Sequence, residues 1–314
     1  MAINIVLAYI LDLILGDPRW LPHPVKGMGW MIRKFEPVLR KVFRNERMGG
    51  TVLVALVTGI SWGLGFIIIK LSYFINGYLG SIVSILIIYS SLAAKDLDAE
   101  SSDVYNSLEK KDIISARKKL SLIVGRDTNN LEYHEVVRAA VETVAENTVD
   151  GVISPLFYAF IGGAPLALAY KAVNTLDSTV GYKNEIYKDF GWASAKMDTL
   201  ANFIPARLSV LFLSLASLFT GKDALNSWKI AVRDGRKNPS VNSGIPEAAV
   251  AGALGIRLGG LNYYNSKPIL KPFIGEEVNA LGIGHIKDSI KLSYISSAIF
   301  LIASAVLMFY IGRR

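Results

Sequence analysis

The chain has 314 residues, of which 52% are hydrophobic, and it contains no cysteine. Its mean hydropathy of +0.37 is too high for an ordinary soluble enzyme. The lack of cysteine excludes disulfides, thiolate nucleophiles and cysteine-ligated zinc. The net charge of +8 lies mostly in loops that flank apolar segments, so it indicates membrane topology and not nucleic-acid binding.

Apolar segments along the chain predict a protein that crosses a membrane several times. Segment 1–16 is short, carries Asp12 and lacks a basic start, so a cleaved signal peptide is not expected. Windows 51–69, 71–94 and 292–312 carry no charge and are long enough to span a bilayer. Windows 152–170 and 199–221 are interrupted by Pro, Gly or Arg. We predict an all-α, multi-pass cell-membrane protein that forms one catalytic domain over 1–314. It should have about five or six membrane segments, some of them broken or re-entrant. These segments lie near 1–16, 51–69, 75–94, 152–170, 199–221 and 292–312.

The loops between these segments indicate which parts share a side of the membrane. Their Lys and Arg content places 17–49, 95–150 and 222–291 in the cytoplasm. Segment 171–198 falls outside by simple alternation, or joins the cytoplasmic side if 152–221 dips into the membrane as a polar-lined hairpin. No sustained strand alternation is present, so no sheet is expected. Loop 95–150 is predicted to form amphipathic helices with apolar positions at Val104, Leu108, Ile113, Ala116, Leu120 and Ile123.

The stretch VRAAVETVAENTVDGVISP (137–155) places acidic side chains directly before an apolar run. On a helix, Glu135, Arg138, Glu142, Glu146 and Asp150 fall on one broad face, with Val and Ala residues on the other side. Such a face is either a salt-bridged surface or the wall of a polar site. The sequence leaves both readings open.

Polar clusters at the edges of the apolar segments supply the candidate chemistry. Ionisable groups at membrane depth are costly, so Asp12, Arg207 and Glu247 are functional candidates. Carboxylates suit Mg²⁺, and Arg and Lys suit phosphate. The three histidines are not placed together, and no glycine-rich nucleotide-binding motif is present. The residues alone therefore indicate a phosphate or polyanion site at the membrane face.

Six stretches resemble one family, the adenosylcobinamide-phosphate synthases of cobalamin biosynthesis (the CbiB/CobD family). They run in family order over nearly the whole chain, with Val241 where the family usually has proline. They are LDLILGDPRWLPHPVKGMGWMI, GRDT, EVVRAAVETVAENTVDGVISPLFY, KAVNTLDSTVGY, FGWASAKMDTLANFIPARLS and NPSVNSGIPEAAVAGALGIRLGGLNYY.

The resemblance implies an enzyme that forms an amide bond. It would join the propionate carboxylate of adenosylcobyric acid to aminopropanol or its O-phosphate, giving adenosylcobinamide or its phosphate. ATP and Mg²⁺ are the implied cofactors, and the corrinoid is a substrate. The implied partners are the lipid bilayer and other late cobalamin-pathway membrane proteins. A corrinoid-binding or transport protein without ligase activity is the alternative, and so is a structural or regulatory membrane protein.

Site roles follow from side-chain chemistry within the matching motifs, since the resemblance assigns only the motifs. Catalytic roles are predicted for Glu142, Glu146, Asn147, Asp150 and Asp177, with Mg²⁺ at Glu146 and Asp150. Substrate-binding roles are predicted for Asp17, Arg126, Asp127, Asn174, Ser178, Lys183, Asp198, Asn202, Arg207, Asn242 and Glu247.

Overall fold

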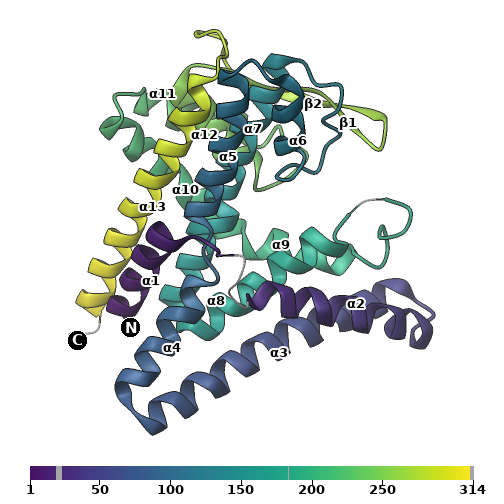
Figure 1. Cartoon of the computed structure of the whole chain (residues 1–314), viewed down its shortest axis with the longest axis vertical. Helices are drawn as coiled ribbons and strands as arrows, with labels where there is room; N and C mark the ends of the chain where they lie inside the picture. The colour runs from purple at the N-terminus through teal and green to yellow at the C-terminus, as the bar shows by residue number, and fades with distance from the viewer. Residues whose placement is uncertain (19–22, 183, 312–314) are drawn as a thin grey trace. The chain divides into compact units, whose positions relative to one another are not determined.

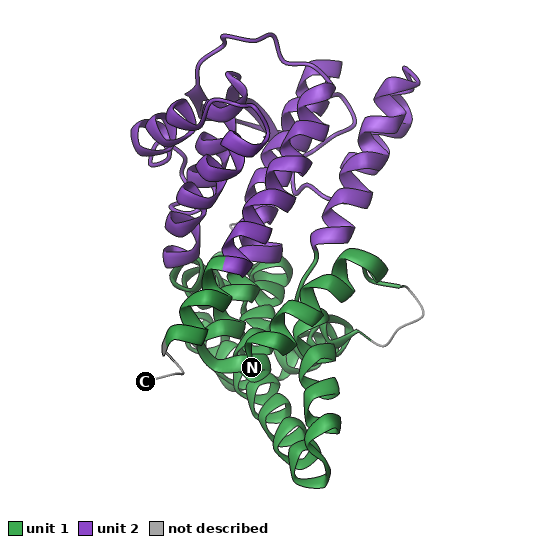
Figure 2. Ribbon diagram, turned by 90° about the vertical axis from the view of Figure 1, so that its left-hand side faces the viewer, with its two compact units in different colours: residues 1–93, 154–202, 303–314 green, residues 94–153, 203–302 purple. Residues whose placement is uncertain are grey.

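The computed structural model describes residues 1–18, 23–182 and 184–311, and it is mostly helical (Figure 1). The chain forms two compact units, coloured separately in Figure 2. Unit 1 comprises residues 1–93, 154–202 and the end of the chain from 303, and unit 2 comprises residues 94–153 and 203–302. Each unit is therefore assembled from separate stretches of sequence.

Unit 1 is built around the contacts of α3 with α2 and α8. Asn45 caps the start of α3 by accepting from the backbone of Arg47 and Met48, and Asn76 caps α4 by accepting from Tyr78. The core beneath α2 contains Met28 and Ile32. The helices of this unit are α1 (Ala2–Leu15), α2 (Pro24–Val42), α3 (Glu46–Ile75), α4 (Gly77–Tyr89), α8 (Ser154–Val180) and α9 (Trp192–Ala201).

Helix α8 is broken part-way along its length. Its backbone leaves helical geometry at Gly162 and Gly163, and Gly163 has a φ of 66°, which favours glycine. The rings of Tyr158 and Tyr170 stack with centroids 5.1 Å apart, whereas twelve residues of straight helix would separate them by about 18 Å. The break predicted in segment 152–170 is therefore confirmed, and the helix bends there enough to bring Tyr158 and Tyr170 into contact.

Unit 2 contains the helices predicted in loop 95–150. Val104, Leu108, Ala116 and Leu120 are all buried, as their spacing predicted. Asp112 caps α6 through the backbone of Ser115. The elements of this unit are α5 (Ala94–Glu109), α6 (Ile113–Leu120), α7 (Tyr133–Asn147), the π-helix η1 (Thr148–Ile153), α10 (Phe203–Phe219), α11 (Ala224–Asp234), α12 (Gly244–Leu254), β1 (Arg257–Tyr264), β2 (Lys267–Gly275) and most of α13 (Gly284–Ile311).

The expectation of no sheet was wrong, because β1 and β2 form an antiparallel hairpin. The turn is made by Asn265 and Ser266 with positive φ, without the glycine that usually marks such turns. Gly259 and Gly260 interrupt the alternation of β1 beside an irregularity in the register. Most of β2 is exposed, so neither strand shows a clear period of two.

Four described helices are long and apolar enough to cross a membrane: 46–75, 77–109, 133–180 and 284–310. Counting α9 and α10, which meet at a bend of 41°, as one broken span raises the number to five. Helix α1 is apolar but shorter. The chain is thus a mostly helical protein with the elements of a multi-pass membrane protein.

Candidate active site

The acidic face of α7 is buried in unit 2. Glu142 is 2% exposed, and its Oε2 lies 2.5 Å from Arg126 Nη2. Its Oε1 accepts from the backbone N–H of Gly259 at 2.9 Å and lies 3.5 Å from Arg138 Nη1. Both carboxylate oxygens are therefore engaged by the protein itself. Of the two readings left open by the sequence, the solvated salt-bridged surface is excluded for this residue.

The same network of hydrogen bonds holds strand β1 of the hairpin against α7. Arg138 donates to the carbonyls of Gly259 and Leu261. Asn262, fully buried, accepts from Arg126 at 2.7 Å and from Arg138 at 3.1 Å through its Oδ1. Burial lowers the pKa of Arg126, but Glu142 outweighs this and the net direction is upward. Arg126 thus stays charged, as a buried partner of Glu142 must.

A second group of ionisable side chains adjoins this network. Glu247, in the first turn of α12, is 3% exposed and accepts from Asn238 Nδ2 at 2.9 Å. Its pKa lies well above the usual value, first because of burial and then because of the charges of Glu142 and Glu146. Lys271, on β2, interacts electrostatically with both Glu146 and Glu247.

Lys271 keeps its charge despite partial burial. Burial lowers the pKa of Lys271, yet Glu247, Tyr264 and Glu142 outweigh that effect and the net direction is upward. Glu146 is only partly buried and hydrogen-bonds to the Ser243 side chain. We call Glu146, Glu247 and Lys271 the carboxylate–lysine cluster. It brings two carboxyl groups and a lysine together from three different elements.

The remaining predicted residues of unit 2 lie around these groups in different roles. Asp127 accepts from the backbone of Asn265 and Ser266 and so holds the hairpin turn. Asn147 donates to the carbonyl of Thr143 within its own helix. Asp150 lies partly buried in η1.

Arg207 and Asn242 are brought together in unit 2. Arg207 Nη1 lies 3.3 Å from Asn242 Oδ1 and donates to the carbonyl of Phe203 at 2.7 Å. The guanidinium also stacks on the Phe203 ring, at 3.4 Å from its centroid. These contacts of Arg207 are all with neutral groups.

Unit 1 holds a separate set of predicted residues. Asn202, 1% exposed, accepts from Ser154 Oγ at 2.6 Å and Tyr170 OH at 2.8 Å, and donates to Asp198 at 3.1 Å. This buried network ties α9 to both halves of α8. Asp17 pairs with His23 at 3.2 Å. Ser178 donates to the carbonyl of Thr175. Asn174 and Asp177 lie on the second half of α8, and Lys183 falls outside the described residues.

Sequence reasoning missed the contributions of the hairpin. Lys271 and Asn262 were not predicted because no sheet was expected, and Asn238 lies in a turn before α12. An amide or lysine on an unrecognised strand carries no periodic signal. Asn238 and Asn262 both lie in the stretch NPSVNSGIPEAAVAGALGIRLGGLNYY, which carried the resemblance, and this was the one signal that could have found them. The turn there forms with Val241, since Ser243 N donates to Ser240 Oγ at 3.2 Å.

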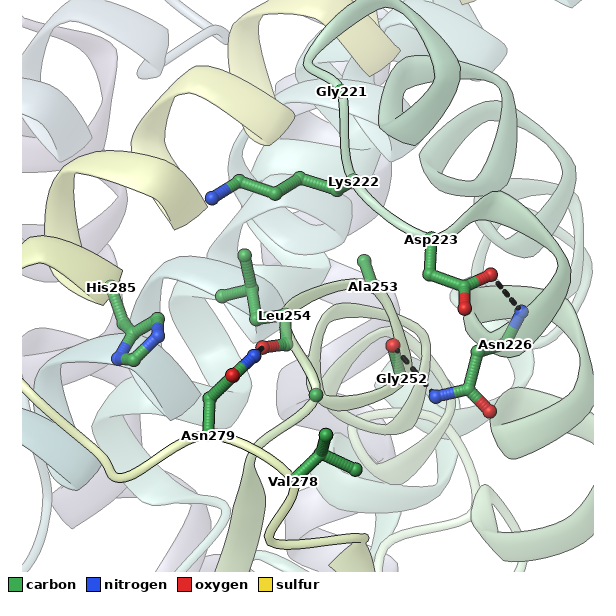
Figure 3. A pocket seen from close by; sticks show the side chains of 11 residues that line it. Gly221, Lys222, Asp223, Asn226, Gly252, Ala253, Leu254, Val278, Asn279 and His285 are labelled. Atoms are coloured by element: carbon green, nitrogen blue, oxygen red, sulfur yellow. Dashed lines mark hydrogen bonds between the residues drawn. The ribbon is translucent and has the colours of Figure 1, made fainter.

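A cavity of about 280 Å³ lies elsewhere in unit 2, at the C-terminal end of α12 (Figure 3). Lys222, Asp223, Asn226, Asn279 and His285 are among its lining residues. Two of them are bound to the helix end, because Asn226 donates to Gly252 O and Asn279 to Leu254 O. None of the predicted site residues lines this cavity.

Comparison with known proteins identifies the family. Residues 5–293 match the family described as CobD/Cbib protein. The chain belongs to the CobD/CbiB family. It is 50% identical over 303 residues to the cobalamin biosynthesis protein CobD of Geobacter metallireducens, covering 96% of this chain and 95% of that one. CobD of Clostridium perfringens is 48% identical, covering 90% of each chain, and that of Klebsiella pneumoniae is 45% identical, covering 98% and 96%. No solved structure shows significant similarity.

Membership of the CobD/CbiB family fits the location of the carboxylate–lysine cluster. Glu146 lies in the stretch ETVAENTVDG and Glu247 in NSGIPEAAVAG, two of the stretches that carried the resemblance. Lys271 lies beyond these stretches but still within the residues matched to the family. Two of the three side chains of the cluster thus lie in stretches that carried the resemblance, and all three lie within the residues matched to the family.

Proposed function

We propose that this CobD/CbiB-family protein acts in cobalamin biosynthesis as an ATP-dependent ligase. It joins the propionate carboxylate of adenosylcobyric acid to the amine of aminopropanol or its O-phosphate, giving adenosylcobinamide or adenosylcobinamide phosphate. The observation that carries the proposal is the carboxylate–lysine cluster, since amide formation needs a proton acceptor, a hydrogen-bond donor and a cation in one place.

The reaction sets out what each group must do. A carboxylate is a poor acyl donor, so ATP first converts it to an acyl phosphate with release of ADP, or to an acyl adenylate with release of pyrophosphate. The amine then attacks the carbonyl carbon, a C–N bond forms, and the phosphate or AMP leaves with the electron pair of the C–O bond. The attacking nitrogen loses a proton, which the Glu146 carboxylate accepts in our scheme.

The other two groups of the cluster interact with negative charge on the substrate. Glu247, whose pKa burial raises well above its usual value, would in its protonated form donate a hydrogen bond to the oxyanion that develops on the carbonyl. Lys271, still charged, attracts the anionic acyl donor. The Arg126–Glu142–Arg138 network positions the hairpin that carries Lys271 and takes no chemical step.

The protein offers carboxylates enough for Mg²⁺ only if nucleotide phosphates supply the other oxygen ligands. Mg²⁺ needs only one or two carboxylates when nucleotide phosphates supply further oxygens. Glu146 with Asp150 remains the predicted pair, whereas Glu142 is excluded because Arg126, Arg138 and Gly259 occupy its oxygens. Among the described residues no group of three or more His, Asp or Glu forms a ready metal site. Bound there with ATP, Mg²⁺ would neutralise phosphate charge.

The test is product formation by the purified protein in detergent or nanodiscs. It receives adenosylcobyric acid, ATP, Mg²⁺ and either aminopropanol or its phosphate, and the corrinoid products are identified by mass spectrometry. We expect a mass increase equal to the amine minus water, dependent on ATP. Corrinoid binding without any such product, in wild type and with every amine offered, would contradict the proposal.

One observation favours transport as the second candidate. The break in α8 at Gly162–Gly163 makes it an interrupted helix of the kind that lines transporter sites. Proteoliposomes separate the two functions. A transporter moves labelled corrinoid across the bilayer without changing its mass, whereas a ligase changes its mass without needing a sealed vesicle.

A further inference from the structure

Helix α2 has two opposite faces. Met28, Ile32 and Leu39 are buried in the core of unit 1. On the other side, Lys26, Trp30, Arg33, Lys34 and Lys41 are all exposed and fall within a stripe of about 100° around the helix axis. We call this stripe, together with Arg44 just beyond the helix, the basic face of α2.

Four of the five basic side chains on the basic face form no ion pair with the residues that the structure describes. Glu36 is the sole acid of α2, and it lies beside Arg40, which contacts it at 3.0 Å and also binds Glu46 at 2.7 Å. Over the described parts of the chain, no carboxylate forms an ion pair with Arg33, Lys34, Lys41 or Arg44. Four positive charges are therefore presented together to whatever surrounds this helix.

Aromatic side chains accompany these charges. Trp30 is 55% exposed, and Lys34 Nζ lies 5.2 Å from the centroid of its ring. Arg47, at the start of α3, similarly lies 5.8 Å from the ring of the exposed Trp192. Tryptophan beside lysine or arginine is typical of the interface between a bilayer and water.

The position of α2 along α3 places the basic face near that interface. The buried side of α2 shares its core with Leu53 and Val57, in the first turns of α3. Further along, α3 exposes large apolar side chains such as Trp62, Ile67 and Phe74, which suit contact with acyl chains. Helix α2 thus lies alongside the beginning of α3 (Figure 1), and the large apolar side chains exposed on α3 come further along that helix.

We propose that the basic face of α2 binds the headgroups of anionic phospholipids. Each headgroup offers a phosphate monoester or diester oxygen to Arg or Lys, and Trp30 inserts beside it at the level of the headgroups. The positive-inside rule explains only which side the charges lie on. It does not require them to be gathered on one stripe of one helix with a tryptophan.

A matched pair of variants tests the proposal. The first removes four charges from the basic face: Arg33→Gln, Lys34→Gln, Lys41→Gln and Arg44→Gln. The control removes four exposed charges from unit 2: Lys110→Gln, Lys111→Gln, Lys118→Gln and Lys229→Gln. Each protein is placed in nanodiscs of phosphatidylcholine with or without phosphatidylglycerol. The thermal midpoint and the anionic lipid retained after a detergent wash are measured.

The wild type and the control should gain thermal stability from phosphatidylglycerol and retain it. The first variant should lose that gain and bind the anionic lipid about tenfold more weakly or worse. Replacing Arg33 and Arg44 by Lys keeps the charge and should keep the gain, which separates lipid binding from a folding defect. Loss of the gain in both quadruple variants would overturn the proposal. So would an equal gain from inorganic phosphate with phosphatidylcholine alone, because that would identify a soluble anion as the ligand.

Discussion

One turn of α7 separates two carboxylates with different surroundings. Glu142 has both oxygens engaged by Arg126, Arg138 and Gly259, whereas Glu146 is only partly buried beside Ser243 and Lys271. A group that acts on substrate must be reachable, so the chemistry is assigned to Glu146 and the structural task to Glu142. Their substitution should therefore have different consequences.

The change Glu146→Gln should abolish most turnover without loss of protein. The amide keeps the size of the side chain but cannot accept a proton, which lowers the rate by about 10²-fold or more. Glu142→Gln should instead destabilise the fold, since an unpaired buried Arg126 costs about 3–5 kcal/mol. Turnover and thermal midpoints, with exposed Glu185→Gln as control, distinguish the two. Near-normal turnover of Glu146→Gln would remove this residue from the mechanism.

Glu247 should make stability depend on pH. Burial and the nearby Glu142 and Glu146 raise its pKa in the folded state, above an unfolded value of about 4.3. Its contribution to stability is thus complete below about pH 4.3 and is lost as pH rises through the folded pKa. Glu247→Gln mimics the neutral acid and can still accept from Asn238. Its thermal midpoint should fall less than that of wild type towards alkaline pH, and parallel pH profiles would show that Glu247 is ionised at neutral pH.

Arg207 should serve phosphate recognition. Its guanidinium stacks on Phe203 and reaches Asn242, so Arg207→Lys keeps the charge but loses the planar fork that grips two oxygens. We expect KM for ATP or for aminopropanol phosphate to rise about tenfold, with the protein level preserved. Comparing phosphorylated and unphosphorylated aminopropanol tells which phosphate is bound. Loss of the variant from the membrane would mean that Arg207 is structural.

At the scale of elements, the break in α8 bears on the side of the membrane reached by the loop of residues 184–191, which follows this helix. Arg40 Nη2 donates to Ile186 O at 3.1 Å, and Arg47 pairs with Asp189 at 2.9 Å. Gly50 allows the backbone of Phe190 to approach, since a Cβ there would lie 1.8 Å from its carbonyl oxygen. The loop is thus held against the start of α3, which supports the re-entrant alternative for 152–221.

Cysteine labelling tests that topology in a chain without native cysteine. Lys188→Cys, in loop 184–191, should behave like Arg44→Cys and resist an impermeant maleimide in intact cells. Tyr78→Cys, at the other end of α3, should react from outside. All three positions are exposed. Labelling of position 188 together with position 78 would place the loop across the bilayer from α2 and contradict the hairpin.

At the scale of the whole molecule, nucleotide and metal should stabilise the protein jointly. Mg²⁺ is expected to bind through nucleotide phosphates as well as Glu146, so neither ligand alone completes the site. ATP with Mg²⁺ should raise the thermal midpoint more than the sum of the separate effects, because binding to the folded state stabilises it by mass action. Glu146→Gln should lose this synergy. Equal effects of ATP with Mg²⁺ and ATP with a chelator would contradict it.

The sequence alone predicted the features that depend on local pattern. Apolar length predicted the membrane segments, the spacing of Val104, Leu108, Ala116 and Leu120 predicted α5 and α6, and Gly162–Gly163 with Pro165 predicted the break in α8. These follow from bilayer thickness, helical period and glycine backbone freedom, which act within a few turns of chain.

Only the tertiary structure decided how distant residues combine. The hairpin was missed because its glycines and exposed second strand carry no period of two. Lys271 and Asn262 were missed together with the hairpin. Both interact with residues of α7 that lie more than a hundred positions earlier in the sequence. The same packing buries Glu142 on the acidic face of α7 but leaves Glu146, on the same face, only partly buried. Burial and pairing are set by what packs against a helix face, and a sequence pattern records only which residues share that face.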